Sequence, residues 1–408
     1  MELLSGATLA DGRVVSVAID GETIAWVGEA GESPPDVASV TDLGGALLLP
    51  APAEPHAHLD KALSADRLVN ERGDLAGAIE VWSREREGLD VDDIAERASA
   101  ALRTLVANGA TAVRSHTDVG EGVGVRGIEA LHAVRSAHAH LADLQIVAFA
   151  SSPLTGSEGA ANRRWLERAL ELGADVIGAC PALDPRPPEL IDLVLDGADS
   201  AGLAVDLHVD ETLDPSVRTI ELLAQAVLDR SFAGAVTASH CVSLGMQNPA
   251  DQVRIAARIA DAGIGVVTLP QTNLFLQARD HPTAPPRGLT AIRALRNAGA
   301  EVAGGGDNVS DPFNLVGRAD PLETAALLVM AAHLMPIDAY DAVSRIARSV
   351  LGLVPGGIEV GAPAELLAIE APTLRAAVAG ASPNRTVWHR GRRVASTTTT
   401  VELANPSP

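Results

Sequence analysis

Lysine, cysteine and aromatic residues are scarce in this sequence. Lys61 is the only lysine among 31 basic residues, aromatic residues make up 2% of the chain, and Cys180 and Cys241 are the only cysteines. Two cysteines in 408 residues exclude a disulfide framework, so a reducing compartment is expected. The first residues, MELLSGATLADG, lack a basic start and a long apolar run, and we therefore expect no secretory signal.

Positive charge and long hydrophobic runs are also missing. The formal net charge is −22, and no apolar run reaches the roughly 18 residues that a transmembrane helix needs. Because nucleic acids and anionic membranes both bind basic patches, we expect neither as a partner. Hydrophobic residues make up 47% and charged residues 21% of the chain, which is typical of a well-packed globular protein. These features together predict a cytoplasmic protein.

The two ends of the chain share one pattern, and the centre has another. Asp-Gly turns separate short apolar runs in residues 1–50, and similar runs return at 364–369 and 385–395. We therefore predict one small β-sandwich domain built from residues 1–50 and 358–408.

Residues 51–357 alternate between short buried strands and helices. The predicted strands are a segment just before His56, then 111–116, 145–149, 176–179, 205–208, 236–240, 265–269 and 302–307. The predicted helices between them are 92–108, 161–172, 216–229, 251–262 and 289–298. Repeated strand and helix at this spacing predicts an α/β protein with a TIM-like (β/α)8 barrel.

Histidines and one aspartate end several of these apolar strands, where catalytic side chains gather in such barrels. His56 and His58 are two residues apart and so point to the same side of an extended chain. His208 and Asp307, from the fifth and eighth strands, can converge with them on one ion. Imidazole is the commonest zinc ligand and also suits iron. The sequence predicts a metal site at these four residues.

The fourth strand favours one metal ion over two. Barrel hydrolases with two metals need a bridging acidic group, often a carboxylated lysine on this strand, and residues 176–181 contain neither lysine nor carboxylate. We therefore expect one divalent ion, zinc or iron, per chain. Cys180, in the same segment, is either a soft ligand or a small core residue.

Two further residues are candidates for proton transfer. Glu211 follows the predicted ligand His208 by three residues, which suits a carboxylate that carries protons between metal-bound water and substrate. Alternatively, Glu211 caps the following helix. His240 ends a strand, where it polarises a substrate carbonyl, steadies an attacking hydroxide, or is a hydrogen-bonded core residue.

The rest of a pocket is harder to assign. Phe149, Phe275 and Phe313 are candidate pocket walls, and residues 116–118 either line the pocket or pack at a strand end. The charged run 80–93 is either a solvated helix and turn or a lid. The histidines expected at the surface are His132, His138, His140 and His389.

Seven segments, in this order, resemble the cytosine deaminase branch of the amidohydrolase superfamily. They are PAEPHAHLDKA, RSHTDV, LQIVAFA, LGADVIGACP, DLHVDE, VTASH and GGGDNVSDPF, and the resemblance runs almost from end to end. This branch includes bacterial cytosine deaminase and N-isopropylammelide isopropylaminohydrolase. The resemblance implies a distorted (β/α)8 barrel with a mononuclear metal site.

The resemblance also implies a role for each site residue. It makes His56, His58, His208 and Asp307 the metal ligands. Glu211 matches a proton-shuttling glutamate, and His240 matches a hydroxide-orienting histidine. Metal-activated water would attack an sp2 ring carbon, Asp307 would accept a proton, Glu211 would protonate a ring nitrogen, and ammonia or an amine would leave. The expected enzyme is a metal-dependent hydrolase that deaminates a small nitrogen heterocycle or removes a substituted amine from it.

Departures from the family pattern bear on the substrate. Cytosine deaminase has a glutamine that reads the pyrimidine edge, where this chain has Ser151 and its neighbours, and the Asp-Asp pair of the eighth strand is Asp307-Asn308 here. An amide both donates and accepts hydrogen bonds, so Asn308 must meet a different substrate edge. We expect Lys61, which the isopropylammelide enzyme shares, to contact substrate, or to pair with Asp60 or Glu54 as a brace.

Two other functions remain open for the same residues. The site would also suit hydrolysis of a cyclic or linear amide bond, and a metal-binding relative without catalysis is a further possibility. Related enzymes suggest a homo-oligomer, but the sequence has no repeat or heptad that indicates one.

Overall fold

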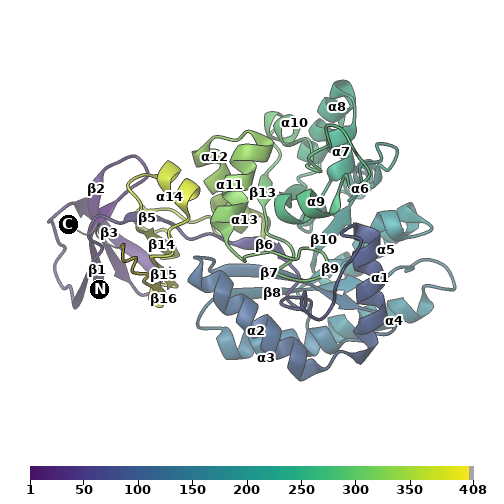
Figure 1. Ribbon diagram of the computed structural model, residues 1–408, viewed down its shortest axis with the longest axis horizontal. Coiled ribbons are helices and arrows are strands. Elements are labelled where there is room, and N and C mark those ends of the chain that lie inside the picture. The colour runs from purple at the N-terminus through teal and green to yellow at the C-terminus, as the bar shows by residue number, and fades with distance from the viewer. Residues whose placement is uncertain (404–408) are drawn as a thin grey trace.

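A computed structural model describes residues 1–403 and places the centre of the chain in a parallel barrel (Figure 1). Its eight strands pair in the order β13-β12-β11-β10-β9-β8-β7-β6. They are β6 (Glu54–Ala57), β7 (Ala112–Val119), β8 (Asp143–Ala150), β9 (Val176–Gly178), β10 (Ala204–Val209), β11 (Val236–His240), β12 (Gly265–Thr268) and β13 (Val302–Gly304). A single bridge between Ala57 and Asp307 links the first and last strands. The TIM-like barrel is confirmed.

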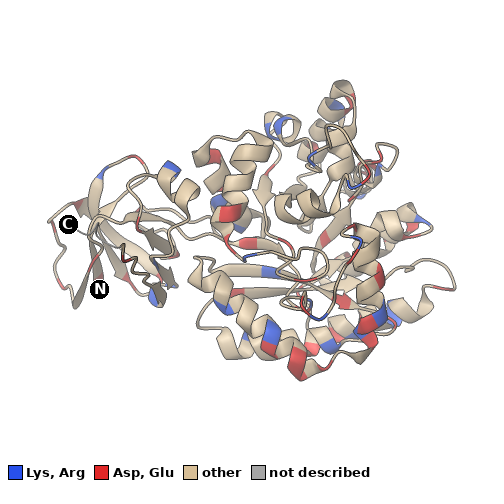
Figure 2. Ribbon diagram, in the orientation of Figure 1, with Lys and Arg blue, Asp and Glu red and all other residues tan. Residues whose placement is uncertain are grey.

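Helices surround this barrel and bury one face against it. In α2 the buried residues Ile94, Ala98, Leu102 and Leu105 recur every three or four positions, as an amphipathic helix requires. Burying one such leucine contributes roughly 1.5–3 kcal/mol. The outer faces of α1 and α2 carry both acidic and basic residues (Figure 2).

The helices of residues 1–403 include all five that the sequence predicts, with shifted ends. They are α1 (Leu75–Glu85), α2 (Val91–Ala107), α3 (Arg126–His138), α4 (Ala160–Glu171), α5 (Pro187–Ala201), α6 (Thr219–Arg230), α7 (Val242–Met246), α8 (Pro249–Asp261), α9 (Pro270–Leu276), α10 (Ile292–Asn297), α11 (Pro321–Ala332), α12 (Pro336–Val343), α13 (Arg345–Val350) and α14 (Leu374–Gly380), with short 3-10 turns η1 (Arg86–Gly88) and η2 (Pro181–Leu183). None of them is long and apolar enough to span a membrane.

The chain ends form a second sheet beside the barrel, on the left of Figure 1. Its strands are β1 (Glu2–Thr8), β2 (Val14–Asp20), β3 (Thr23–Glu29), β4 (Ser39–Asp42), β5 (Leu47–Pro50), β14 (Leu366–Ile369), β15 (Arg385–His389) and β16 (Arg392–Thr397). Antiparallel pairing of β5 with β14 joins the two ends, as the sequence predicts. We propose that the β domain comprises residues 1–50 and 358–408 and that the barrel domain comprises residues 51–357. Residues 404–408 lie outside the described residues.

One sequence prediction is wrong in the second sheet. His389 is buried, 2% exposed, and its Nδ1 lies 3.0 Å from Oε2 of Glu365. The last three residues of β15, which ends at His389, are all buried, and a buried carboxylate gives this histidine a partner.

Closure of the barrel depends on a buried carboxylate that also positions the site. Glu54, in β6, accepts hydrogen bonds from the backbone N–H groups of His56 at 3.1 Å and Gly306 at 2.9 Å. A Cβ atom at Gly305 would lie 2.8 Å from Oε1 of Glu54, so this close approach needs glycine. Burial raises the pKa of Glu54 to about 8 despite these two hydrogen bonds. The first strand is thereby fixed to the segment that carries Asp307.

Candidate active site

A cavity of about 780 Å³ opens at the C-terminal ends of the barrel strands. The predicted site residues that line it are His58, Lys61, Phe149, Ser151, His208, Glu211, His240, Asp307, Asn308 and Phe313. His56 lies beneath it and is fully buried. Phe275 does not line the cavity, and the expectation that it forms a wall is wrong; its ring lies 4.6 Å from the guanidinium carbon of Arg279.

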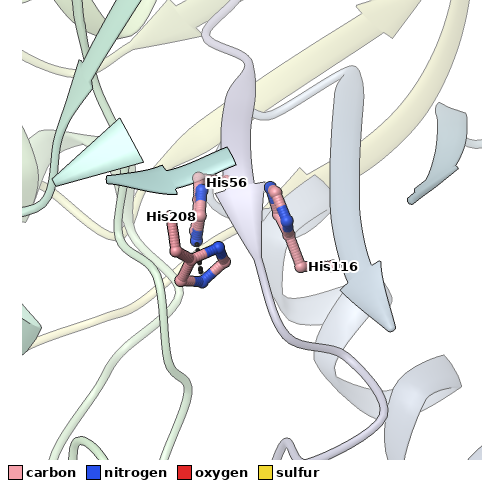
Figure 3. Close-up of side chains that lie close together, drawn as sticks. All are labelled: His56, His116 and His208. Atoms are coloured by element: carbon pink, nitrogen blue, oxygen red, sulfur yellow. Dashed lines mark hydrogen bonds between the residues drawn. The ribbon is translucent and has the colours of Figure 1, made fainter. Parts of the chain in front are cut away.

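The four predicted metal ligands approach one another at the floor of this cavity. The Nε2 atom of His208 lies 3.2 Å from Nε2 of His56 and 3.1 Å from Nε2 of His58. Asp307 approaches from the last strand, with Oδ1 3.4 Å from Nε2 of His58. Figure 3 shows the His56 and His208 rings meeting. The ligand atoms of His56, His58 and Asp307 lie within 4.8 Å of one another, and His208 contacts the two histidines of this group.

A hydrogen-bonded chain behind His56 fixes its tautomer. The hydroxyl of Ser239 donates to Oδ1 of Asp206 at 2.9 Å, so it accepts from Nδ1–H of His56, also at 2.9 Å. Arg114 donates to the other oxygen of Asp206 at 2.8 Å. With its proton on Nδ1, the His56 ring presents the Nε2 lone pair to the cluster.

His58 is held in the same way. Its Nδ1 donates to the backbone carbonyl of His116 at 3.1 Å, which leaves Nε2 free to accept. Burial lowers the pKa of His56, His58 and His208 well below the usual histidine value, and neighbouring charged groups add to this effect. All three rings are therefore neutral, which is the state that binds a metal ion.

These residues fit a divalent metal ion. Both carboxylate oxygens of Asp307 are buried without a hydrogen-bond partner, and burial together with nearby Glu211 raises its pKa. A buried carboxylate needs a compensating cation. Two nitrogens bound tetrahedrally to zinc at about 2.0–2.1 Å stand roughly 3.3 Å apart, close to the separations found here. The orphaned oxygens and the spacing of the ring nitrogens both match a bound cation.

His116, which the sequence predicts either to line the pocket or to pack at a strand end, belongs to a second group of potential ligand atoms. The ligand atoms of His56, His116 and His208 also lie within 4.8 Å of one another. However, His116 is stacked on His56 at 3.9 Å between ring centroids and does not line the cavity. Its Nε2 instead lies 3.5 Å from Oδ2 of Asp206. His116 lies in the middle of β7 rather than at the predicted strand end, and its ring centroid is 4.8 Å from that of His208. Figure 3 shows it on the side of His56 away from the contact between His56 and His208.

Glu211 and His240 lie side by side at the edge of the cluster. Oε1 of Glu211 is 3.6 Å from Nδ1 of His240, and that nitrogen is 3.1 Å from Oδ1 of Asn273. Oδ1 of Asn273 accepts a hydrogen bond from Nδ1–H of His240. Nε2 of His240 is therefore unprotonated and can accept a hydrogen bond; it lies 4.0 Å from Oδ2 of Asp307. Burial lowers the pKa of His240 to about 4 and raises that of Glu211 to about 8. Glu211 can therefore hold a proton near neutral pH.

The helix-capping role weighed for Glu211 belongs to its neighbour Asp210. Its carboxylate accepts from the backbone N–H groups of Thr219 and Ile220, at 2.9 and 3.1 Å. Asp210 thus satisfies two free N–H groups at the start of α6, which begins at Thr219 rather than at the predicted residue 216. Glu211 is left free to face the cavity.

Lys61 is buried at the cavity wall between two carboxylates. Its Nζ donates to Asp60 at 3.1 Å and to Asp118 at 2.9 Å, and it lies 4.9 Å from the centroid of the Trp82 ring. Burial opposes the charge of Lys61, but the two aspartates outweigh it and raise its pKa. The predicted partner Asp60 is confirmed and Glu54 is not, because Glu54 binds backbone amides elsewhere.

Asn308, Ser151 and Cys180 also line the cavity, and their polar atoms have different partners and properties. The Nδ2 of Asn308 donates to Asp311 at 2.8 Å, and its Oδ1 accepts from the Thr272 hydroxyl at 3.5 Å, which leaves one lone pair of Oδ1 for a substrate donor. Ser151 places its hydroxyl 3.4 Å from Nη1 of Arg86. Burial raises the pKa of the Cys180 thiol to about 12, with Glu211 adding to the effect, and Cys180 belongs to neither group of potential ligand atoms in residues 1–403.

The sequence analysis missed three supporting residues, namely Asp206, Ser239 and Asn273, and did not foresee that Asp118, which lines the cavity, pairs with Lys61. One signal was present: Asp206 precedes His208 by two residues in an otherwise apolar strand, so both face the barrel interior. The contacts of Asn273 and Asp118 join distant strands and helices and have no local signature.

The fold and the site define a metal-dependent hydrolase with a TIM-like barrel. The model of the amidohydrolase family matches residues 86–395, and the chain belongs to this family. A pterin deaminase from Rhizobium rhizogenes is 33% identical over 369 residues, which span 89% of this chain and 84% of that protein. The predicted family and enzyme class are confirmed.

Two solved structures superpose over nearly the whole chain. The 5-methylcytosine deaminase from Klebsiella pneumoniae with bound 5-fluorocytosine has a TM-score of 0.88, 28% identity and 99% coverage of both chains. The N-isopropylammelide isopropylaminohydrolase from Burkholderia multivorans has a TM-score of 0.83 and 27% identity, covering 97% of this chain and 98% of its own.

Proposed function

We propose that the protein is a mononuclear metal-dependent aminohydrolase that removes an amino or substituted amino group from a nitrogen heterocycle. The observation that carries this proposal is the close approach of His56, His58, His208 and Asp307 at the floor of a cavity, with Glu211 and His240 beside them. The relatives support it, because those described above include deaminases named for pterin and 5-methylcytosine.

In this proposal the four converging side chains hold one zinc or iron ion. When bound, the ion supplies a Lewis acid that lowers the pKa of water towards 7. The remaining chemistry belongs to the protein. Oδ1 of Asp307 faces the ligand nitrogens, whereas Oδ2 lies towards His240. One carboxylate oxygen is thus available as a ligand and the other can accept a proton.

The proton route follows from the neighbouring groups. Nε2 of His240 is an acceptor and orients the attacking water, and Asp307 takes one of its protons. As the water oxygen bonds to an sp2 ring carbon, Glu211 protonates the adjacent ring nitrogen. The bond from this carbon to the amino nitrogen then breaks, and the leaving nitrogen takes the proton held by Asp307. The proton of the new hydroxyl returns to Glu211, so that ammonia or an amine is released and a ring carbonyl remains.

The cavity favours a substrate larger than a single ring. A volume of about 780 Å³ lies in the upper part of the range for drug-sized ligands. Oδ1 of Asn308 would accept an N–H group of the ring, and Phe149 and Phe313 supply apolar walls. We therefore propose a two-ring amino heterocycle of the pterin type. Homo-oligomer formation and a cytoplasmic location stay predictions.

The first experiment is ammonia release by protein reconstituted with zinc or iron, measured with pterin, cytosine, 5-methylcytosine and aminotriazines. Glu211→Gln should lower turnover about 10²- to 10⁴-fold at unchanged metal content. Glu189→Gln, an exposed position on α5, is the matched control and should match wild type. A Glu211→Gln variant as active as wild type would refute the assigned role.

Other products would assign a different reaction to the protein. Release of an alkylamine from N-alkylated substrates would assign that leaving group, and ring-opened product would favour amide-bond hydrolysis. Full metal occupancy without any product across the panel would favour a metal-binding protein without catalysis.

A further inference from the structure

Arg86 is a cationic cavity residue to which the proposed reaction gives no role. It begins η1 directly after α1 and lines the cavity together with Ser151. Its Nη1 reaches to 3.4 Å from the Ser151 hydroxyl, although the two residues lie 65 positions apart. A guanidinium from another element therefore reaches this position.

The backbone around Arg86 is held in place by a second arginine. Nη2 of Arg126 donates to the carbonyls of Arg86 at 2.9 Å, Glu87 at 3.2 Å and Gly122 at 2.8 Å. One turn earlier, Nε1 of Trp82 donates to Asp118 at 2.6 Å and ties α1 to the end of β7. The guanidinium of Arg86 thus extends from a fixed segment, as an anion-binding residue should.

Arg86 also has no acidic partner. Within residues 1–403, no carboxylate oxygen lies within 4.0 Å of its side-chain nitrogens, whereas Arg84, at the end of α1, pairs with Glu85 at 2.9 Å. A half-buried, uncompensated guanidinium that faces a cavity is suited to a carboxylate or a similar anion.

The position of Arg86 specifies which end of the substrate it meets. Ser151 follows Phe149 by two residues, or about 7 Å of extended chain, and the Phe149 ring lies 4.3 Å from the His208 ring. A ring that reacts beside His208 therefore needs a second ring or a substituent to reach Arg86. A guanidinium only donates hydrogen bonds, so the group that it meets must offer an acceptor, and an anionic acceptor also compensates its charge.

We propose that Arg86 binds an anionic group, such as a carboxylate, at the end of the heterocycle remote from the leaving amine. This inference rests on the proposed function, because it takes the reacting end to lie beside His208. Arg86 is a specificity-determining residue in this proposal and takes no part in proton transfer.

The test compares pterin with pterin-6-carboxylate as probes. Arg86→Gln should raise KM for the carboxylate probe about 10- to 100-fold more than KM for pterin, with little change in kcat for either. Arg84→Gln makes the same charge change outside the cavity and should leave both KM values unchanged. Arg279→Gln removes a charge from another part of the cavity wall and should affect both probes equally. An equal rise in KM for both probes with Arg86→Gln would overturn the proposal.

A binding measurement separates this proposal from the proposed function. Dissociation constants of both probes are measured by calorimetry on Glu211→Gln, with and without Arg86→Gln, so that no turnover is required. A wild-type enzyme inactive on both probes contradicts the pterin-type reaction. Selective loss of carboxylate binding would still support the role of Arg86, whereas equal binding of both probes in both backgrounds would refute it.

Discussion

Removal of the Ser239 hydroxyl should weaken metal binding without unfolding the barrel. Ser239 accepts from Nδ1 of His56 and donates to Asp206, both at 2.9 Å, and Arg114 holds the other oxygen of Asp206. Ser239→Ala leaves the His56 N–H and one Asp206 oxygen without their partner. The ring of His56 then loses the contact that sets its tautomer and orientation.

The size of this effect follows from the burial of all three groups. Ser239, His56 and Asp206 are each 0% exposed, so water cannot replace the lost hydrogen bonds. A buried donor without a partner costs about 1–3 kcal/mol. Loss of a group that orients a metal-binding histidine weakens metal affinity about 10- to 100-fold, which corresponds to about 1.4–2.7 kcal/mol. The two values agree, and both are small beside a typical folding free energy of about 5–15 kcal/mol.

The assay is metal affinity of the apoprotein by competition with a chelator, together with urea unfolding. Ser16→Ala is the matched control, because Ser16 is equally buried, lies in β2 and has no hydrogen-bond partner for its hydroxyl. We expect the zinc dissociation constant to rise 10- to 100-fold in Ser239→Ala and to stay unchanged in Ser16→Ala. A folded Ser239→Ala protein with affinity within threefold of wild type would refute this reasoning.

Two further predictions concern buried charges. Lys61→Met leaves Asp60 and Asp118 buried without their cation and should lower the free energy of unfolding, measured in urea, by about 3–5 kcal/mol. A loss below about 1 kcal/mol would show that the two aspartates are solvated. The second concerns Glu365: burial raises its pKa, but His389 and Arg348 outweigh this and hold it below 4.5. Its stabilising contribution is therefore present above pH 4.5 and lost as the pH falls through the lower folded-state pKa. Glu365→Gln should flatten the acid side of a stability profile, and an unchanged slope would contradict this.

The sequence predicts the site residues that follow a recognisable strand. His56, His58, His208 and Asp307 follow short apolar segments, and the rule that barrel strands share one C-terminal end brings them together. The β-rich chain ends are predicted for a similar reason, because Asp-Gly turns mark their hairpins. Local pattern and fold geometry together are sufficient for these features.

Contacts between elements far apart in the chain are not predictable in this way. Lys61 and Asp118 are 57 residues apart, and nothing near Lys61 indicates that Asp118 rather than Glu54 is its partner. The burial of His389 depends on its place at the buried end of β15 and on Glu365 in a neighbouring segment. Each case requires the position of a second side chain that only the folded chain provides.

The barrel separates the residues that carry the chemistry from those that recognise the substrate. The proposed ligands and proton-transfer groups lie on or next to β6, β10, β11 and β13, where backbone pairing and buried hydrogen bonds fix them. Arg86 instead extends from η1, outside the barrel sheet. Residues in such a segment can change without disturbing the metal site, whereas a change at Ser239 or Glu54 cannot. Family resemblance therefore predicts the reaction, and the substrate must be deduced from the cavity wall.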